Sequence, residues 1–205
     1  MMHLFITVSS PYARIVRVAA METGLDSRMD VEVVTVRDPK SALLSYNPTG
    51  KVPTLRTESG EILSETRIIL EHLDTLHLGE KLLADKYDLA GRASEGRIFG
   101  CLDGVSTWAR EFMRPEPSRF LWLMEVEHAR AARCFDFFEK DRALQNDGIR
   151  VAQIALGCTV GFADKLLDDF DWRDGRPNLA AWYDAFTERP SMRSTMPKKL
   201  KKGDA

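Results

Sequence analysis

Residues 47–55, Asn-Pro-Thr-Gly-Lys-Val-Pro-Thr-Leu, form a segment that could hold an extended peptide. A proline inside an apolar run of strand type removes a donor from the ladder, so we predict that the strand begins at Pro53. If the Val52–Pro53 bond is cis, Val52 presents its backbone N–H and C=O sideways. A peptide ligand could then dock on Val52 as an additional strand.

A second segment, Ser64-Glu65-Thr66, precedes an apolar rhythm typical of a helix. Ser64 is predicted to be the N-cap, which puts Glu65 and Thr66 in the first helical turn. There the free N–H groups and the positive helix end attract a carboxylate, and the Glu65 side chain can take an ammonium group. The segment thus matches one end of an amino acid, with both of its charges.

The third segment is Val8-Ser9-Ser10-Pro11, at the end of the first predicted strand. Proline is favoured at the first helical position, so Ser10 is predicted to be the N-cap and Ser9 keeps a free hydroxyl. That hydroxyl would lie near a helix N-terminus, where developing negative charge is stabilised. Two alternatives are that both serines form only the turn and cap, or that the cap shifts and Ser10 has the free hydroxyl. Tyr12 is a further candidate.

The elements that position these segments change in kind near residue 80. Before it, short strands alternate with helices; after it, the hydrophobic spacing is helical throughout. The predicted strands are 3–8, 31–36, 54–56 and 62–63, and the predicted helices are 11–23, 39–46, 65–76, 87–113, 118–139, 150–167 and 178–188, with a short piece near residue 191.

The motif Asn-Pro-x-Gly-Lys-Val-Pro-x-Leu and the acidic-hydroxyl pair Glu65-Thr66 resemble the glutathione transferase superfamily, over nearly the whole chain. The resemblance implies an α/β thioredoxin-like N-terminal domain, with a four-stranded mixed sheet and helices, and an all-α C-terminal domain. The corresponding bounds are 1–78 for the first domain, 79–86 for a linker, 87–197 for the helical domain and 198–205 for a basic tail.

The resemblance also implies roles for individual residues. The backbone of Val52, before the cis proline Pro53, would pair with the cysteinyl part of glutathione. Glu65 and Thr66 would bind the γ-glutamyl end, although the family usually has Ser at the second position. Lys51 would approach the glycyl carboxylate. In serine-type members a Ser two residues before the proline position hydrogen-bonds the glutathione sulfur, and that role falls on Ser9.

The function that the resemblance implies is that of a glutathione S-transferase, with glutathione as co-substrate and a small hydrophobic electrophile as partner, working as a homodimer. The electrophile pocket would involve Trp108, Arg110 or Phe112. The absence of cysteine from 9 to 14 argues against the cysteine-type, thiol-exchange branch. Two alternatives remain: a glutathione-dependent isomerase, peroxidase or dehalogenase, and a non-catalytic interaction protein similar to the stringent starvation proteins.

Composition sets further bounds. The chain has 205 residues, a net charge of -2 and 44% hydrophobic residues, which gives no electrostatic reason to expect a nucleic-acid partner. The sequence contains no apolar stretch of about 20 residues that would predict a membrane span. No leader pattern follows Met1, so a cytoplasmic location is predicted.

The spacing of the histidines predicts no metal site. The cysteines, Cys101, Cys134 and Cys158, fit no C-x-x-C pair and are predicted to be inert core thiols.

The predicted helix 150–167 lacks a cap that many members of the superfamily have there. Those members open this helix with a Ser/Thr-x-x-Asp capping box, whereas this chain has Arg150-Val151-Ala152-Gln153. Arg150 has no acceptor for the first helical N–H groups, so Asn146 or Asp147 is a candidate cap.

Overall fold

The computed structural model describes residues 1–197 except 143, 146–147 and 168, so the predicted tail 198–205 and the candidate caps Asn146 and Asp147 lie outside the described residues. The chain divides into two compact units, one from Met1 to Leu83 and one from Ala84 onward. The division falls inside the segment 79–86 that the sequence predicts as a linker. In the described part of the chain no helix has both the length and the apolar character that crossing a membrane requires.

The first unit contains a four-stranded mixed sheet, as predicted. Its strands are β1 (Met2–Ile6), β2 (Met29–Val33), β3 (Thr54–Arg56) and β4 (Ile62–Ser64), in the order β2-β1-β3-β4. β1 pairs parallel with β2 and antiparallel with β3, and β3 pairs antiparallel with β4. Pro53 itself lies one residue before the start of β3, which agrees with its lack of a ladder donor.

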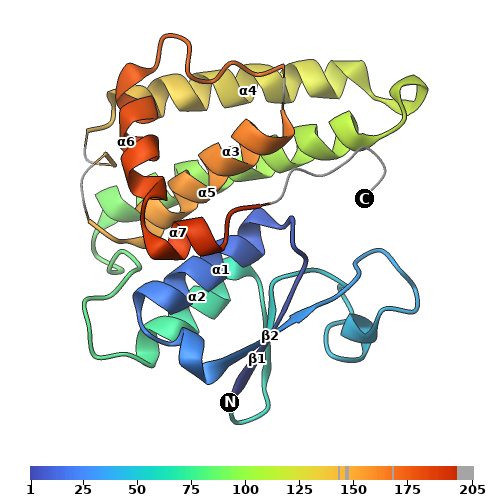
Figure 1. The fold of residues 1–205 in the computed structure, drawn as a ribbon, viewed down its shortest axis with the longest axis vertical. Helices are drawn as coiled ribbons and strands as arrows, with labels where there is room; N and C mark the ends of the chain where they lie inside the picture. Colours follow the sequence, from blue (N-terminus) through green and yellow to red (C-terminus); the bar gives the residue numbers. More distant parts are fainter. Residues whose placement is uncertain (143, 146–147, 168, 198–205) are drawn as a thin grey trace. The chain divides into compact units, whose positions relative to one another are not determined.

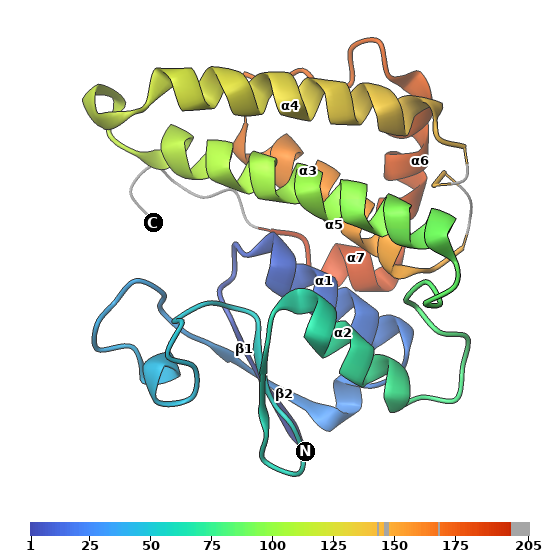
Figure 2. The ribbon, with the colours of Figure 1, turned by 180° about the vertical axis from the view of Figure 1, so that it is seen from behind.

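Two helices, α1 (Pro11–Glu22) and α2 (Thr66–Thr75), pack against each other and lie on the same side of this sheet (Figures 1 and 2). Their apolar faces and the inward faces of the strands form one core, because burial of apolar surface is the main favourable term in folding. The core residues of this cluster are Met2, Leu4, Ile6, Ala13, Val16, Ala20, Leu25, Met29, Leu55, Ile69 and Leu73. The predicted helix 39–46 is instead a short 3-10 helix, Ala42–Ser45, and another 3-10 turn covers Asp26–Arg28.

The start of α2 differs from the prediction. Ser64 is the last residue of β4, and Glu65, with φ 70° and ψ 127°, is the residue that flanks the helix. The pairing of Ser64 with Thr54 holds Ser64 in the sheet, so the chain turns within a single residue before the helix begins at Thr66. The side chain of Glu65 does not cap α2. The prediction of Ser64 as N-cap was therefore wrong, and Thr66 alone of the predicted pair belongs to the helix.

The second unit is helical. It contains α3 (Leu89–Met113), a 3-10 turn (Glu116–Ser118), α4 (Leu121–Lys140), α5 (Val151–Leu166), α6 (Pro177–Thr187) and α7 (Pro190–Ser194). α3 packs against both α4 and α5, and α6 packs against α4, α5 and α7. Figure 1 shows α3 and α4 as long neighbouring helices, with α5 beside α3.

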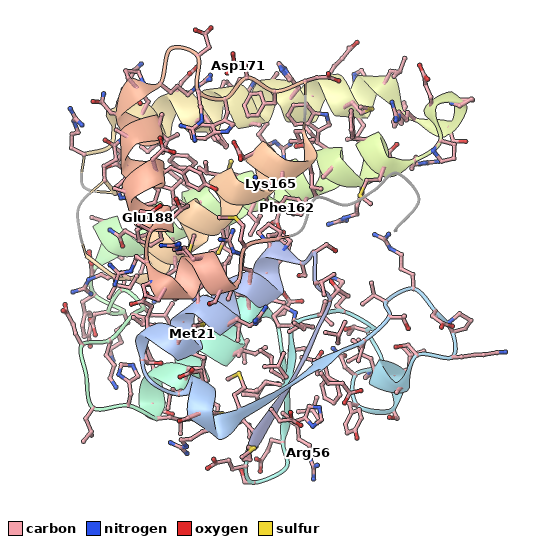
Figure 3. All side chains as sticks on the ribbon, viewed as in Figure 1. Met21, Arg56, Phe162, Lys165, Asp171 and Glu188 are labelled. Carbon is pink, nitrogen blue, oxygen red and sulfur yellow. The ribbon has the colours of Figure 1, made fainter. Side chains whose placement is uncertain are left out.

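The helix α5 is the centre of the second unit. Every residue from Val151 to Ala163 is buried, so the helix is buried on all sides, as expected of a core helix. Figure 3 shows the side chains of the unit, with Phe162 and Lys165 labelled on α5. Phe162 belongs to the core, whereas Lys165, the last residue but one of the helix, is partly exposed.

Candidate functional site

The pairing register of the sheet brings the three predicted segments to one edge. Phe5 on β1 lies opposite Thr54 on β3, and Thr54 lies opposite Ser64 on β4. Because β1 and β4 both run antiparallel to β3, the residues after Ile6, those before Thr54 and those after Ser64 leave the sheet at the same edge. Ser9 and Ser10, Val52 and Pro53, and Glu65 and Thr66 therefore gather at that edge, all within the first unit.

A buried amide organises the loop before β3. The Asn47 side chain, 3% exposed, donates from Nδ2 to Thr54 Oγ1 at 2.8 Å and to the Lys51 carbonyl at 3.4 Å. Its Oδ1 accepts hydrogen bonds from the Thr49 amide and hydroxyl. The Thr54 hydroxyl in turn donates to the Lys51 carbonyl at 2.8 Å. The loop is thus fixed from inside by Asn47 and Thr54, for which the sequence alone predicts no structural role.

This loop presents a backbone surface at Val52. The Val52–Pro53 peptide bond is cis. Pro53 is buried, Val52 is half-buried and the Lys51 side chain is exposed. Across the part of the chain that the structure describes, the N–H and C=O of Val52 take part in no hydrogen bond. An unpaired donor and acceptor on one residue are the groups that an extended ligand would use.

Glu65 and Thr66 form the corresponding corner after β4. Glu65 is exposed and has a φ of 70°, a region that L-residues with a side chain rarely adopt. Thr66 is 5% exposed and opens α2. The side chain of Glu65, which flanks the helix, does not cap it, so the first amides of α2 receive no acceptor from that residue. The corner can accept an anionic group at the amides and a cationic group at the Glu65 carboxylate.

The two serines at the end of β1 have different surroundings. Ser10 is the N-cap of α1, as predicted, and its hydroxyl accepts a hydrogen bond from the Ala13 amide at 3.2 Å. Ser9 lies in the preceding turn and is half-buried. Its hydroxyl makes no hydrogen bond within the described residues. Ser9 therefore has a hydroxyl available for a ligand, one residue before the cap of α1, whose N-terminus favours nearby negative charge.

The second unit contains an apolar pocket of its own, with a volume of about 360 Å³. It lies between the C-terminal part of α3, the N-terminal part of α4 and the segment after α5. Its lining residues are Trp108, Phe112, Leu121, Met124, Glu125, His128, Leu167 and Asp169. Two of the three residues predicted for an electrophile pocket, Trp108 and Phe112, line it, whereas Arg110 is exposed on α3 and does not.

The prediction of three inert core thiols needs a correction. Cys101 and Cys158 are buried, but Cys134 is only half-buried. A hydrogen bond from Cys101, followed by the nearby Arg133 and Arg130, lowers the pKa of Cys134 to about 7.

Among the residues that the structure describes, no group of three or more histidine, cysteine or carboxylate side chains could hold a metal ion.

A mixed β2-β1-β3-β4 sheet with two helices on one side, followed by an all-helical unit, defines a thioredoxin-like protein with a helical second unit. The sequence profile of the glutathione S-transferase N-terminal domain matches residues 9–76, and that of the C-terminal domain matches residues 123–185.

Solved structures and a curated relative agree with these profiles. A glutathione S-transferase from Methylobacillus flagellatus KT, solved with glutathione bound, is 31% identical, with a TM-score of 0.85 over 97% of this chain and 100% of that chain. A glutathione transferase family member from Pseudomonas fluorescens Pf-5, with bound glutathione, is 29% identical, with a TM-score of 0.86 and the same coverage. The Escherichia coli K12 protein named "Uncharacterized GST-like protein YibF" is 27% identical over 97% of this chain and 100% of its own length. The chain belongs to the glutathione S-transferase family.

Proposed function

We propose that this protein binds glutathione at the edge of the first unit and activates the glutathione thiolate for attack on a small hydrophobic electrophile. The observation that carries this proposal is the sheet register, which gathers Ser9, Val52 and the start of α2 at one edge. Two solved relatives of similar sequence have glutathione bound, which supports the choice of ligand.

The peptide part of glutathione would pair with the main chain of Val52. The unpaired N–H and C=O of this residue offer one donor and one acceptor to the cysteinyl residue of the ligand. Lys51, exposed beside Val52, would approach the glycyl carboxylate at the end of the ligand. Asn47 and Thr54 hold the loop in place before the ligand arrives, which reduces the entropy that binding must overcome.

The γ-glutamyl end would bind at Glu65 and Thr66. Its α-carboxylate would accept hydrogen bonds from the first amides of α2 and from the Thr66 hydroxyl, where the helix end carries a partial positive charge. Its ammonium group would pair with the Glu65 carboxylate. Such charge-assisted hydrogen bonds are roughly twice as strong as neutral ones.

The cysteinyl sulfur would accept a hydrogen bond from Ser9. A thiol of this type has an ordinary pKa near 8.5, so about one molecule in thirty is ionised at pH 7. A donor that stabilises the thiolate lowers the pKa of the thiol and raises the fraction that can act as nucleophile. Ser10 is the less suitable donor, because its hydroxyl already caps α1.

The apolar pocket on the second unit is the candidate binding place for the electrophile. Trp108 and Phe112 supply aromatic surface there, and Glu125, His128 and Asp169 supply polar groups. Predominantly apolar walls with a few polar groups are typical of sites for small organic molecules. The homodimer and the cytoplasmic location stay predictions from the sequence.

The test is calorimetric titration of glutathione into the full chain and into two variants, Glu65→Ala and Ser9→Ala. Glu65→Ala should bind glutathione about tenfold more weakly or worse, because it loses the charge-assisted contact. Such a contact contributes about 1.4 kcal/mol or more, and 1.4 kcal/mol corresponds to a factor of ten in Kd. Ser9→Ala should keep most of the affinity but lose the ultraviolet absorbance of the bound thiolate. The hydroxyl stabilises the ionised sulfur and not the peptide.

Absence of binding by the parent protein at millimolar glutathione would refute the proposal. Equal affinity of the parent and Glu65→Ala would refute the position of the γ-glutamyl end. If Ser9→Ala retained the thiolate absorbance, another group would be the hydrogen-bond donor to the thiolate. Ser10→Ala and Tyr12→Phe would then be measured in the same way.

A further inference from the structure

Two cysteines that are far apart in the sequence face each other across α3 and α4. The register of these antiparallel helices is fixed on both sides of the cysteines. On one side, the Arg97 guanidinium lies over the Phe137 ring at 5.0 Å. On the other side, the Trp108 and His128 rings meet edge to face at 5.0 Å. Cys101 on α3 and Cys134 on α4 occupy the matching positions between these two contacts.

One turn from Cys101, α3 has a glycine, Gly104, against which side chains of α4 pack. A Cβ at Gly104 would lie 2.6 Å from a carboxylate oxygen of Glu127 and 3.0 Å from Cδ of Arg130. Glycine thus leaves room for two α4 side chains against the backbone of α3, one turn from Cys101. The thiols of Cys101 and Cys134 share a hydrogen bond.

The two thiols have unequal surroundings. Cys101 is 1% exposed, and the hydrogen bond to Cys134, together with burial, holds its pKa well above the usual value. Cys134 is half-buried. The bond donated by Cys101, then the charges of Arg133 and Arg130, lower its pKa to about 7. Cys134 is therefore the thiolate that solutes can reach, and Cys101 is the protonated thiol behind it.

We propose that Cys101 and Cys134 form a thiol–disulfide redox site in the helical unit, with Cys134 as the attacking thiol and Cys101 as the resolving thiol. The oxidant is a small disulfide, of which glutathione disulfide is the natural example. This site uses no residue of the proposed glutathione-binding edge, so it is independent of the proposed transferase function.

The reaction balances in two steps of thiol–disulfide exchange. The Cys134 thiolate attacks one sulfur of the small disulfide, its sulfur–sulfur bond breaks, and the first small thiolate leaves with the bonding electrons. Cys101 then loses its proton to solvent and attacks the Cys134 sulfur, which releases the second small thiolate. The two cysteines are oxidised by two electrons, and the small disulfide is reduced to two thiols. The second step occurs between facing helices, so the buried position of Cys101 does not prevent it.

The experiment treats the fully reduced chain with glutathione disulfide and, in parallel, with bis(2-hydroxyethyl) disulfide, which has no glutathione features. Intact mass and non-reducing peptide maps are recorded over time. The expected product with both oxidants is a chain that has lost two hydrogens, with Cys101 linked to Cys134. A response to both reagents would separate this site from glutathione binding at Val52 and Glu65.

Three variants identify the roles. Cys101→Ala should stop at a stable mixed disulfide on Cys134, and Cys134→Ala should form neither the adduct nor the internal disulfide. Cys158→Ala, which changes a buried thiol of α5, is the matched control and should react as the parent does. Alkylation of Cys134 in the parent should increase through a pH of about 7, and in Cys101→Ala this increase should move to higher pH.

The proposal would be overturned if the parent chain formed the Cys101–Cys134 disulfide with neither of the two reagents. A stable Cys134 adduct in the parent would overturn it as well, because it would show that Cys101 does not resolve the mixed disulfide. Circular dichroism checks the folding of each variant. The disulfide pairing found in the parent chain tests the proposal even if Cys101→Ala does not fold.

Discussion

At the scale of residues, Glu65 combines an unfavourable backbone with an exposed side chain. Its φ of 70° and ψ of 127° lie outside the regions that residues with a Cβ prefer, and such strain costs about 1–3 kcal/mol. The side chain is exposed and so contributes little packing in return. Strain of this kind persists where the surrounding structure imposes it, and it is common at functional sites. The proposed contact between the Glu65 carboxylate and the ammonium group of the ligand would be the function at this position.

Replacement of Glu65 by glycine separates stability from binding. Glu65→Gly removes the Cβ clash, so we expect the free energy of unfolding to increase by about 1 kcal/mol. Glu65→Ala keeps the Cβ and should leave the stability nearly unchanged. Both variants lack the carboxylate and should bind glutathione about equally weakly. Urea denaturation of the three proteins measures the first effect, and a Glu65→Gly variant no more stable than Glu65→Ala would contradict the strain.

Single residues also show the limits of the sequence reading. Ser10 could be predicted as a cap because Pro11 marks the first helical position by chemistry that is local. Ser64 could not be excluded as a cap from the sequence. Its place is decided by the pairing with Thr54 on another strand, and a non-local contact of this kind overrides the local preference. The unusual backbone conformation of Glu65 could not be predicted either, because it follows from the same pairing of Ser64 in the sheet.

At the scale of elements, α5 forms the core of its unit, yet the residue that flanks its start does not cap it with its side chain. Its N-cap residue, Arg150, has the extended backbone that a capping residue needs, with φ -126° and ψ 167°, but no side-chain acceptor. Burial of thirteen consecutive residues, Val151–Ala163, stabilises the helix whatever caps its start. The N-terminus of α5 is therefore a position where stability can be added.

We expect Arg150→Ser to be more stable than Arg150→Ala by about 1 kcal/mol, because the serine hydroxyl can accept a hydrogen bond from an amide of the first turn. Arg150→Ala is the reference because both variants lose whatever the guanidinium contacts, so their difference isolates the cap. Thermal unfolding of the pair measures it. Equal melting temperatures would show that other groups already satisfy the first amides of α5.

The elements themselves could be predicted from their periodicity more readily than the contacts between them. The long helices α3 and α4 follow from apolar spacing and from the Pro115–Pro117 break, within a few residues at each end. Their relative register is set by Gly104, Glu127 and the ring contacts, and neither helix reveals it alone. The facing of Cys101 and Cys134 was missed for that reason.

At the scale of the whole molecule, the family and the two-unit fold could be predicted, because residues 47–55 and Glu65-Thr66 make a specific motif. The electrophile could not be predicted. The lining of the apolar pocket comes from three separate parts of the second unit: residues within 108–112, residues within 121–128, and the pair Leu167 and Asp169. The composition of such a pocket depends on helix packing, and its apolar walls select by shape and size more than by any sequence motif.

The proposed site also predicts how glutathione changes the stability of the whole chain. A ligand that binds only the folded state raises the free energy of unfolding by about 2.7 kcal/mol at a concentration of 100 times its Kd. For a chain of this size, that increase corresponds to about 5–10 °C in Tm. At the same glutathione concentration, a tenfold weaker Glu65→Ala should show about half of this increase. S-methylglutathione, which has no ionisable thiol, should shift the parent and Ser9→Ala equally, because only the thiolate uses the serine hydroxyl. An identical glutathione shift in the parent and in Glu65→Ala would mean that the stabilising ligand binds away from the edge formed by Ser9, Val52 and Glu65.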